Sequence, residues 1–202
     1  WDLTRYEYIR RFGYYCTESS EHNAEYNNFF IKANYPELIQ KYNIPLDEYP
    51  RRCVNQIAGW KNDREKYLKG DVSHERTHEY ASYIMEAMVT DKPYKIGGNV
   101  LNNGLIPNLP AEACVEVACL VNKYGVQPTK QPPLPLALAA MNMTNINAQL
   151  LTIEAAVTKK KEYIYQAAML EPHTSAELSI DDIVSLCDDL IEAHKGWLPE
   201  YH

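Results

Sequence analysis

The sequence predicts an α+β fold that is mostly helical, with a small, largely antiparallel sheet inserted between the helices. Apolar residues make up 46% of the 202 residues, which is enough for one substantial domain with a packed core. They recur at helical spacing before residue 93 and after residue 135, whereas the segment between them contains alternating patterns. We therefore expect a sheet in the middle of the chain with helices on both sides in sequence.

The first fifty residues predict short helices joined by turns. A helix over Trp1–Phe12 is expected to end at Gly13, because glycine adopts the left-handed C-cap conformation without strain. The polar residues 17–20 lack an apolar stripe and predict a loop that enters a short helix ending near Tyr26. Three prolines in the segment 35–50 predict a helix-turn connection.

Two longer helices are expected next. Pro50 fits the first position of a helix that runs to about Lys69 and ends at Gly70. Ser73 is a suitable N-cap for a second helix that continues to about Thr90. The inner face of this second helix is expected to carry Tyr80, Ile84, Met85 and Met88.

The remaining elements follow from alternation and from capping patterns. Strands are expected over 96–101 and 114–121, with turns at Asn103-Gly104 and Tyr124-Gly125. Val115, Val117 and Cys119 share one face of the second strand. After the proline-rich connector 131–135, apolar patterns predict helices over about 136–157 and 160–170. A last helix over about 179–195 begins with a capping-box variant, in which Ser179 is followed three residues later by Asp182.

Charge and cysteine content exclude several classes of protein. The net charge is −7, and no basic cluster is longer than residues 159–161, which disfavours binding to nucleic acid. The longest strongly apolar stretch, residues 134–140, is too short to span a bilayer, so we expect no membrane partner. Five cysteines, without a C-x-x-C pair, are typical of reduced thiols in the cytoplasm.

One motif suggests a metal site. The run from His74 to His78 matches the H-E-x-x-H pattern of zinc peptidases, in which both imidazoles bind Zn²⁺ and Glu75 acts as the general base. Such a site needs a third protein ligand, and no further histidine follows before His173. A chance match is therefore the preferred interpretation, with a zinc peptidase kept as an alternative.

Two polar segments are candidate binding or catalytic sites. Glu18, Glu21, His22, Glu25 and Tyr26 provide acid–base groups of several pKa values within nine residues, and His22 and Tyr26 project together on a helix. From the residues alone, a solvated helix start is the preferred interpretation. The Asn102-Asn103-Gly104 run offers amides for sugar hydroxyls, although asparagine is more often found there because it tolerates a left-handed turn.

The first of these segments resembles a family signature. Residues 17–26 resemble the T-E-S-S-E-H-x-x-E-Y run of glycoside hydrolase family 4, in particular its α-galactosidases (melibiases). Further motifs of that family follow in the same order, which extends the resemblance over essentially the whole chain. They lie at 44–50, 79–82, 102–106, 108–110, 114–117, 125–128, 144–147, 167–169, 172–174 and 197–199.

This resemblance implies that the chain is a lactate-dehydrogenase-like C-terminal domain, lacking the N-terminal Rossmann domain of the enzyme. No G-x-G-x-x-G follows a strand, and the chain begins at Trp1 without an initiator methionine, as a trimmed protein would. Family enzymes use NAD and Mn²⁺: they oxidise C3 of the sugar, remove the C2 proton, eliminate the aglycone and reduce the ketone again. We expect neither cofactor on this chain alone, and hence no turnover.

The resemblance also implies roles for individual residues. His22 is the first candidate for the base that removes the C2 proton, and Tyr26 the second. Substrate contacts are expected from Glu21, Glu25, Asn102 and Asn103. Asn23 stands where the family usually has an aromatic residue, and Leu101 where an arginine is expected, which bears on sugar preference.

The expected function is therefore that of an α-galactosidase half, which supplies a wall of the sugar pocket and the subunit interface of a homo-oligomer. The alternatives are a family 4 α-glucosidase or related glycosidase domain, and a non-catalytic dimerisation module.

Overall fold

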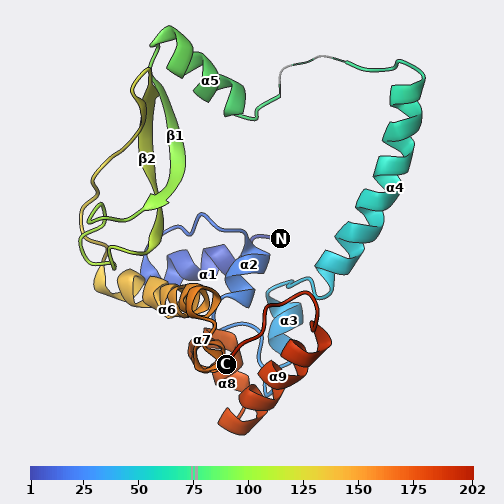
Figure 1. The fold of residues 1–202 in the computed structure, drawn as a ribbon, viewed down its shortest axis with the longest axis vertical. Coiled ribbons are helices and arrows are strands. Elements are labelled where there is room, and N and C mark those ends of the chain that lie inside the picture. The colour runs from blue at the N-terminus through green and yellow to red at the C-terminus, as the bar shows by residue number, and fades with distance from the viewer. Residues whose placement is uncertain (74, 76) are drawn as a thin grey trace.

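The computed structural model describes residues 1–73, 75 and 77–202. It confirms the α+β class, with a three-stranded antiparallel sheet between helical segments. Figure 1 shows the N-terminal helices and the C-terminal helices packed together as one body. The sheet and one long helix extend from this body on opposite sides. Among the described residues, no helix is both long and apolar enough to cross a bilayer.

The N-terminal part of the body consists of α1 (Leu3–Phe12), α2 (Ser20–Glu25) and α3 (Glu37–Lys41). Gly13 ends α1 in the left-handed conformation, with φ of 77°, as expected. A small core holds these helices together through Tyr8 and Phe30, whose rings meet edge to face at 5.6 Å. Because α1 and α2 pack on this shared core, the two ends of the polar segment that joins them are held in place.

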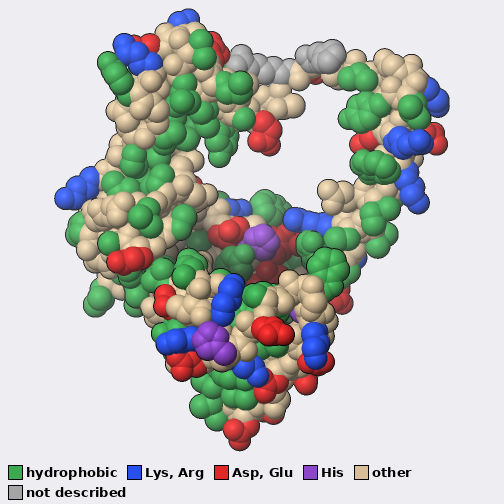
Figure 2. All heavy atoms as spheres, in the orientation of Figure 1, with side chains coloured by type: hydrophobic (Ala, Val, Ile, Leu, Met, Phe, Trp, Pro, Cys, Tyr) green, Lys and Arg blue, Asp and Glu red, His purple; other side chains and the backbone are tan. Residues whose placement is uncertain are grey.

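The helix α4 (Glu48–Leu68) contains no buried residue. It begins two residues earlier than expected, so Pro50 occupies the third helical position, where its missing N–H is still within the first turn and costs no hydrogen bond. Figure 1 shows α4 projecting alone from the body. Figure 2 shows that an opening remains between α4 and the sheet when side chains are included.

The helix α5 (Ala81–Thr90) corrects one prediction. It is preceded by Tyr80 at the N-cap and not by Ser73, so it is about two turns shorter at its start than expected. The inner face was also assigned wrongly, since Met85 is 68% and Met88 45% exposed while Ala87 is buried. Tyr83 packs against the sheet by stacking on the ring of Tyr94 at 5.2 Å.

The sheet comprises β1 (Tyr94–Leu101), β2 (Cys114–Asn122) and β3 (Gly125–Pro128), in the order β1-β2-β3. Both pairings are antiparallel. The expected face of β2 is confirmed, because Val115, Val117 and Cys119 are buried. They pack against Ile146 of the following helix. The short β3 was not expected from the sequence.

The C-terminal part consists of α6 (Leu136–Thr158), α7 (Lys161–Leu170), α8 (Pro172–Glu177) and α9 (Ile180–Ala193). The predicted cap of α9 is confirmed, since Oγ of Ser179 accepts the N–H of Asp182 at 3.2 Å. The short α8 was not anticipated. Its first turn is capped by the Glu171 carboxylate, which accepts the N–H groups of His173 and Thr174.

The close packing of β1 on β2 predicts a compensating pair of substitutions. A methyl group at Gly98 would lie 2.7 Å from Sγ of Cys119, which is fully buried. We expect Gly98→Ala to cost about 1–3 kcal/mol of unfolding free energy, and less in a Cys119→Ala background, where the sulfur is absent. Urea denaturation of the four proteins of this cycle measures the coupling. Gly97→Ala is the control, because its methyl group would meet only the flexible end of Glu116; equal costs at the two glycines would contradict the argument.

Candidate functional site

The polar segment before and within α2 is held in place by one buried asparagine. Asn23 is 5% exposed, and its Nδ2 donates to the carbonyl oxygens of Glu18 at 2.8 Å and Ser19 at 3.0 Å. Its Oδ1 accepts the thiol of Cys16 at 3.0 Å. Ser19 caps the helix by accepting the N–H of His22. These hydrogen bonds hold the backbone of the segment in place, while Glu18, Glu25 and Tyr26 remain exposed.

His22 and Tyr26 project from the same side of α2, as the sequence predicted. Their ring centroids are 5.7 Å apart, with an interplanar angle of 35°. Nδ1 of His22 lies 3.2 Å from a carboxylate oxygen of Glu18. An imidazole oriented by a carboxylate beside a phenol is an arrangement suited to proton transfer.

The two remaining carboxylates of this segment are placed differently. Glu21 borders a small cavity of about 110 Å³ together with Thr4 and Ile44, on the side of α2 that meets the body. Hydrogen bonds from its own backbone N–H and from Ser19 lower the pKa of Glu21. Glu25 is exposed. Glu21 is thus a carboxylate that stays ionised, and it does not share the cavity nearest to the His22–Tyr26 pair.

A larger cavity of about 460 Å³, which we name the α1–α6 cavity, is connected to Tyr26 through one of its lining residues, whereas His22 and Tyr26 do not themselves line it. One wall is formed by the end of α1 and the residues after it, including Tyr14 and Tyr15. The opposite wall is one face of α6, and the start of β2 closes an end. The polar or aromatic residues on its walls are Tyr8, Phe12, Tyr14, Tyr15, Thr17, Glu116, Asn142, Asn145 and Gln149.

Asn145 joins this cavity to the candidate acid–base pair. It lines the α1–α6 cavity, and its Nδ2 donates to the backbone oxygen of Tyr26 at 3.3 Å. Asn145 belongs to the family motif at 144–147, but no individual role was expected for it. A signal was present, because Asn142, Asn145 and Gln149 recur at helical spacing along an otherwise apolar segment.

The turn between β1 and β2 corrects the expectation for Asn102. This residue is fully buried, and its Nδ2 donates to the carbonyl oxygens of Ile106, Leu109 and Pro110 at 3.0, 3.0 and 2.9 Å. Its Oδ1 accepts the N–H of Ile106 at 2.7 Å. Asn102 therefore shapes the turn and is not available to a sugar. Asn103 is exposed with φ of 41°, and adopts the left-handed conformation that asparagine tolerates.

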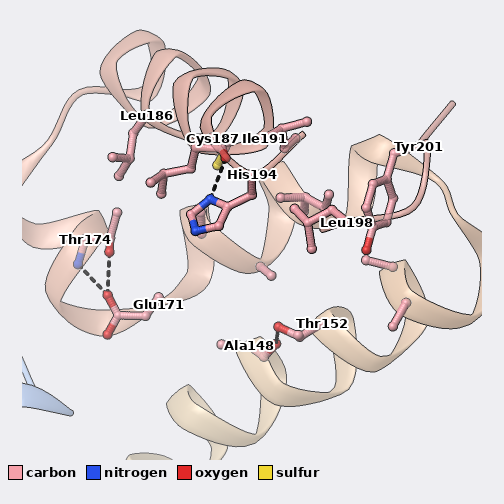
Figure 3. A pocket seen from close by; sticks show the side chains of 16 residues that line it. Ala148, Thr152, Glu171, Thr174, Leu186, Cys187, Ile191, His194, Leu198 and Tyr201 are labelled. Carbon is pink, nitrogen blue, oxygen red and sulfur yellow. Dashed lines mark hydrogen bonds between the residues drawn. The ribbon is translucent and has the colours of Figure 1, made fainter. Parts of the chain in front are cut away.

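A second large cavity, of about 500 Å³, is enclosed by α6, α7, α9 and the C-terminal tail. Figure 3 shows Leu186, Cys187 and Ile191 of α9 lining it opposite Ala148 of α6. Two of its polar groups are engaged elsewhere: Nδ1 of His194 bonds the carbonyl oxygen of Leu190, and Glu171 caps α8. Burial raises the pKa of the Cys187 thiol, which keeps it protonated. This cavity offers apolar packing surface and no reactive pair.

The zinc motif is not supported by the described residues. His74 lies outside them, and His78 is exposed in a bend before α5, so the expected placement of this motif on a helix is wrong. Within residues 1–73, 75 and 77–202, no group of three or more His, Cys, Asp or Glu side chains is arranged to hold a metal ion.

Comparison with known proteins identifies relatives along nearly the whole chain. An α-galactosidase of Bacillus subtilis (strain 168) is 60% identical over 201 residues, which is 99% of this chain and 46% of that protein. The chain therefore spans about half the length of this curated relative. A solved structure described as a glucosidase, lplD, from Bacillus subtilis shares the fold with a TM-score of 0.80 at 20% identity, over 93% of this chain and 42% of that one.

A 6-phospho-α-glucosidase from gut microorganisms, solved with NAD and Mn²⁺, has a TM-score of 0.73 at 18% identity and covers 98% of this chain and 44% of that one. At these identities the two solved structures establish the fold. Residues 2–174 match the family 4 glycosyl hydrolase C-terminal domain. Together with the 60% identity to a curated relative, this match shows that the chain belongs to glycosyl hydrolase family 4 and carries its C-terminal domain.

Proposed function

We propose that this chain is the substrate-facing half of an α-galactosidase that cleaves α-galactosides. The observation that carries the proposal is the His22–Tyr26 pair, because it lies within the segment that resembles the family signature and beside a cavity lined by amides and tyrosines. The 60% identity to an α-galactosidase supports this choice of substrate over a phosphorylated glucoside.

In this proposal His22 is the base that takes the proton from C2 of the sugar. Glu18, 3.2 Å from Nδ1 of His22, favours the tautomer in which Nδ1 carries the hydrogen. The lone pair is then on Nε2, which is free to accept the proton. The phenol of Tyr26 lies beside the imidazole and serves as the second proton-transfer group. Glu25 and Asn103, both exposed, are proposed to contact substrate, and Glu21 to hold the segment as a fixed anion.

NAD and Mn²⁺ are proposed to belong to the other half of the enzyme, a Rossmann domain. The described residues of this chain offer no group of metal ligands, and the sequence has no dinucleotide-binding glycine motif, so neither cofactor fits this half by itself. When bound, they supply the redox and Lewis-acid chemistry of the family. The five cysteines are free thiols, which supports a cytoplasmic enzyme.

The test is an assay of p-nitrophenol release from p-nitrophenyl α-galactoside with NAD and Mn²⁺. We expect no turnover by residues 1–202 alone, and turnover when the chain is co-expressed with the segment encoded upstream of Trp1. Turnover by the chain alone would show that the catalytic half is not missing. An assembled enzyme that hydrolysed only 6-phosphoglycosides would contradict the proposed substrate.

We also propose that the enzyme is a homo-oligomer and that α4 forms an interface between two copies. Exposed apolar side chains lie along one side of this helix: Val54 is 67%, Ile57 58% and Trp60 66% exposed. Tyr49 and Leu68 extend the stripe at the two ends. In an antiparallel pair centred between Ile57 and Trp60, Ile57 of one copy would face Trp60 of the other, and Tyr49 would face Leu68.

Substituting Trp60 with glutamate is expected to convert a dimer into a monomer, because a charge would be buried in the α4–α4 contact. Sedimentation velocity measures the mass of each variant, and circular dichroism confirms that the fold is retained. Asn62→Glu is the matched control, since it adds the same charge to the opposite side of α4 and should leave the dimer intact. A monomeric wild-type chain, or a Trp60→Glu variant that remains dimeric, would contradict this interface.

A further inference from the structure

The face of α6 that lines the α1–α6 cavity carries a row of amides. Asn142, Asn145 and Gln149 are spaced three and four residues apart and all border the cavity. Nδ2 of Asn142 is used within the helix, donating to the Leu138 carbonyl oxygen at 2.8 Å, and Nδ2 of Asn145 bonds Tyr26. Within the described part of the chain, their Oδ1 atoms and the whole amide of Gln149 make no hydrogen bond. These groups can therefore bond a ligand.

The residues at and after the end of α1 add aromatic rings to the same lining, which also contains aliphatic side chains such as Leu134 and Leu138. Tyr14 and Tyr15 line the same cavity, yet they remain 52% and 57% exposed. The guanidinium of Arg5 lies 5.1 Å from the ring of Tyr15 and is also bonded to Asp2, which fixes that side of the wall. A lining that combines aromatic rings with amides matches a saccharide, whose C–H faces pack on rings and whose hydroxyls both donate and accept hydrogen bonds.

The charged residues that line the cavity indicate whether a neutral or a phosphorylated saccharide binds there. Among the described residues that line the cavity, none is lysine or arginine, and Glu116 contributes a carboxylate. A phosphate group would find no cation to pair with, and it would be repelled by this carboxylate. Arg5 does not change this balance, because Asp2 neutralises it. The volume of about 460 Å³ lies within the usual range of small-molecule sites.

We propose that the α1–α6 cavity is a subsite for a neutral saccharide unit, namely the part of the substrate on the leaving-group side of the bond that is cleaved. This placement rests on the proposed function, because Asn145 contacts both the cavity and the backbone of Tyr26. The galactosyl unit then meets His22 and Tyr26, while the adjoining unit occupies the cavity. The absence of a cation among the described lining residues makes this subsite select against phosphorylated sugars.

The experiment is a titration of the ¹⁵N-labelled chain, followed by NMR, with melibiose and with two probes of its leaving-group unit, glucose and glucose 6-phosphate. Melibiose and glucose are expected to shift the side-chain amide signals of Asn142 and Gln149 in a saturable way, and glucose 6-phosphate is expected to bind at least tenfold more weakly than glucose. Gln149→Ala should weaken melibiose binding about tenfold. Asn147→Ala is the control, because this exposed asparagine of α6 is absent from the cavity lining.

The outcomes separate this inference from the proposed function. Shifts confined to α2, or a Gln149→Ala variant that binds as tightly as Asn147→Ala, would overturn the subsite and leave the His22–Tyr26 proposal standing. Saturable shifts at the cavity amides, combined with an assembled enzyme that does not hydrolyse α-galactosides, would support the subsite and overturn the proposed function. No shift with any of the three sugars, or equal binding of glucose and glucose 6-phosphate, would also reject the inference.

Discussion

Replacing His22 with glutamine is expected to lower kcat of the assembled enzyme by about 10²–10⁴-fold, because a positioned general base contributes about that much to rate. Glutamine keeps a polar side chain of similar reach but cannot take a proton from C2. Because His22 is 43% exposed at its side chain, the substitution should leave the fold unchanged. The measurement is the steady-state rate of hydrolysis of p-nitrophenyl α-galactoside, compared with the rate for the same substrate carrying deuterium at C2.

The isotope effect distinguishes a base from a binding residue. If His22 removes the C2 proton, its loss makes that step limiting, so the deuterium effect on kcat should rise. Tyr26→Phe tests the second candidate in the same assay, with Tyr35→Phe as the matched control, since these two tyrosines are 47% and 54% exposed. An unchanged kcat for His22→Gln, together with a large loss of kcat for Tyr26→Phe, would show that Tyr26 and not His22 is the base.

Asn102→Ala is expected to be the most destabilising of the substitutions considered. It would remove four hydrogen bonds made by one fully buried amide and leave the carbonyl oxygens of Ile106, Leu109 and Pro110 without that donor. We expect a loss of about 4 kcal/mol of unfolding free energy, because buried groups left unpaired cost about 1–3 kcal/mol each and part of the turn can relax. Thermal denaturation should show a melting temperature lowered by roughly 10 °C.

An aspartate at this position refines the test. Asn102→Asp keeps an oxygen that can accept the Ile106 N–H, but it places a second oxygen against three carbonyl oxygens, so it should destabilise the chain as strongly as alanine. Asn99→Ala is the control, because this asparagine is exposed on β1. A melting temperature within a degree or two of wild type for either Asn102 variant would refute the structural role.

The elements that the sequence predicted correctly are those whose signals are local. The alternation of Val115, Val117 and Cys119 fixes the buried face of β2, and the Ser179–Asp182 pair fixes the start of α9. The pairing of His22 with Tyr26 likewise follows from their spacing within one helix. Each of these features depends on residues within a few positions of one another.

The features that the sequence did not reveal depend on distant partners. Asn145 acquires its importance from a bond to Tyr26, which is 119 residues away in the chain. Asn102 looked like a sugar-binding residue because nothing in the sequence shows that three carbonyl oxygens converge on its amide. Ser73 was chosen as a cap on propensity alone, whereas α5 begins at Ala81, where Tyr83 reaches Tyr94 of the sheet.

The isolation of α4 makes it a natural reporter of assembly. A helix without buried residues opens locally at little cost, and α4 carries exposed trypsin sites at Arg51, Arg52, Lys61, Arg64 and Lys66. In a free protomer this helix should be the first segment that trypsin cuts. Pairing of two copies would protect it, so the lifetime of one peptide bond in α4 would measure how much of the enzyme is assembled at any concentration.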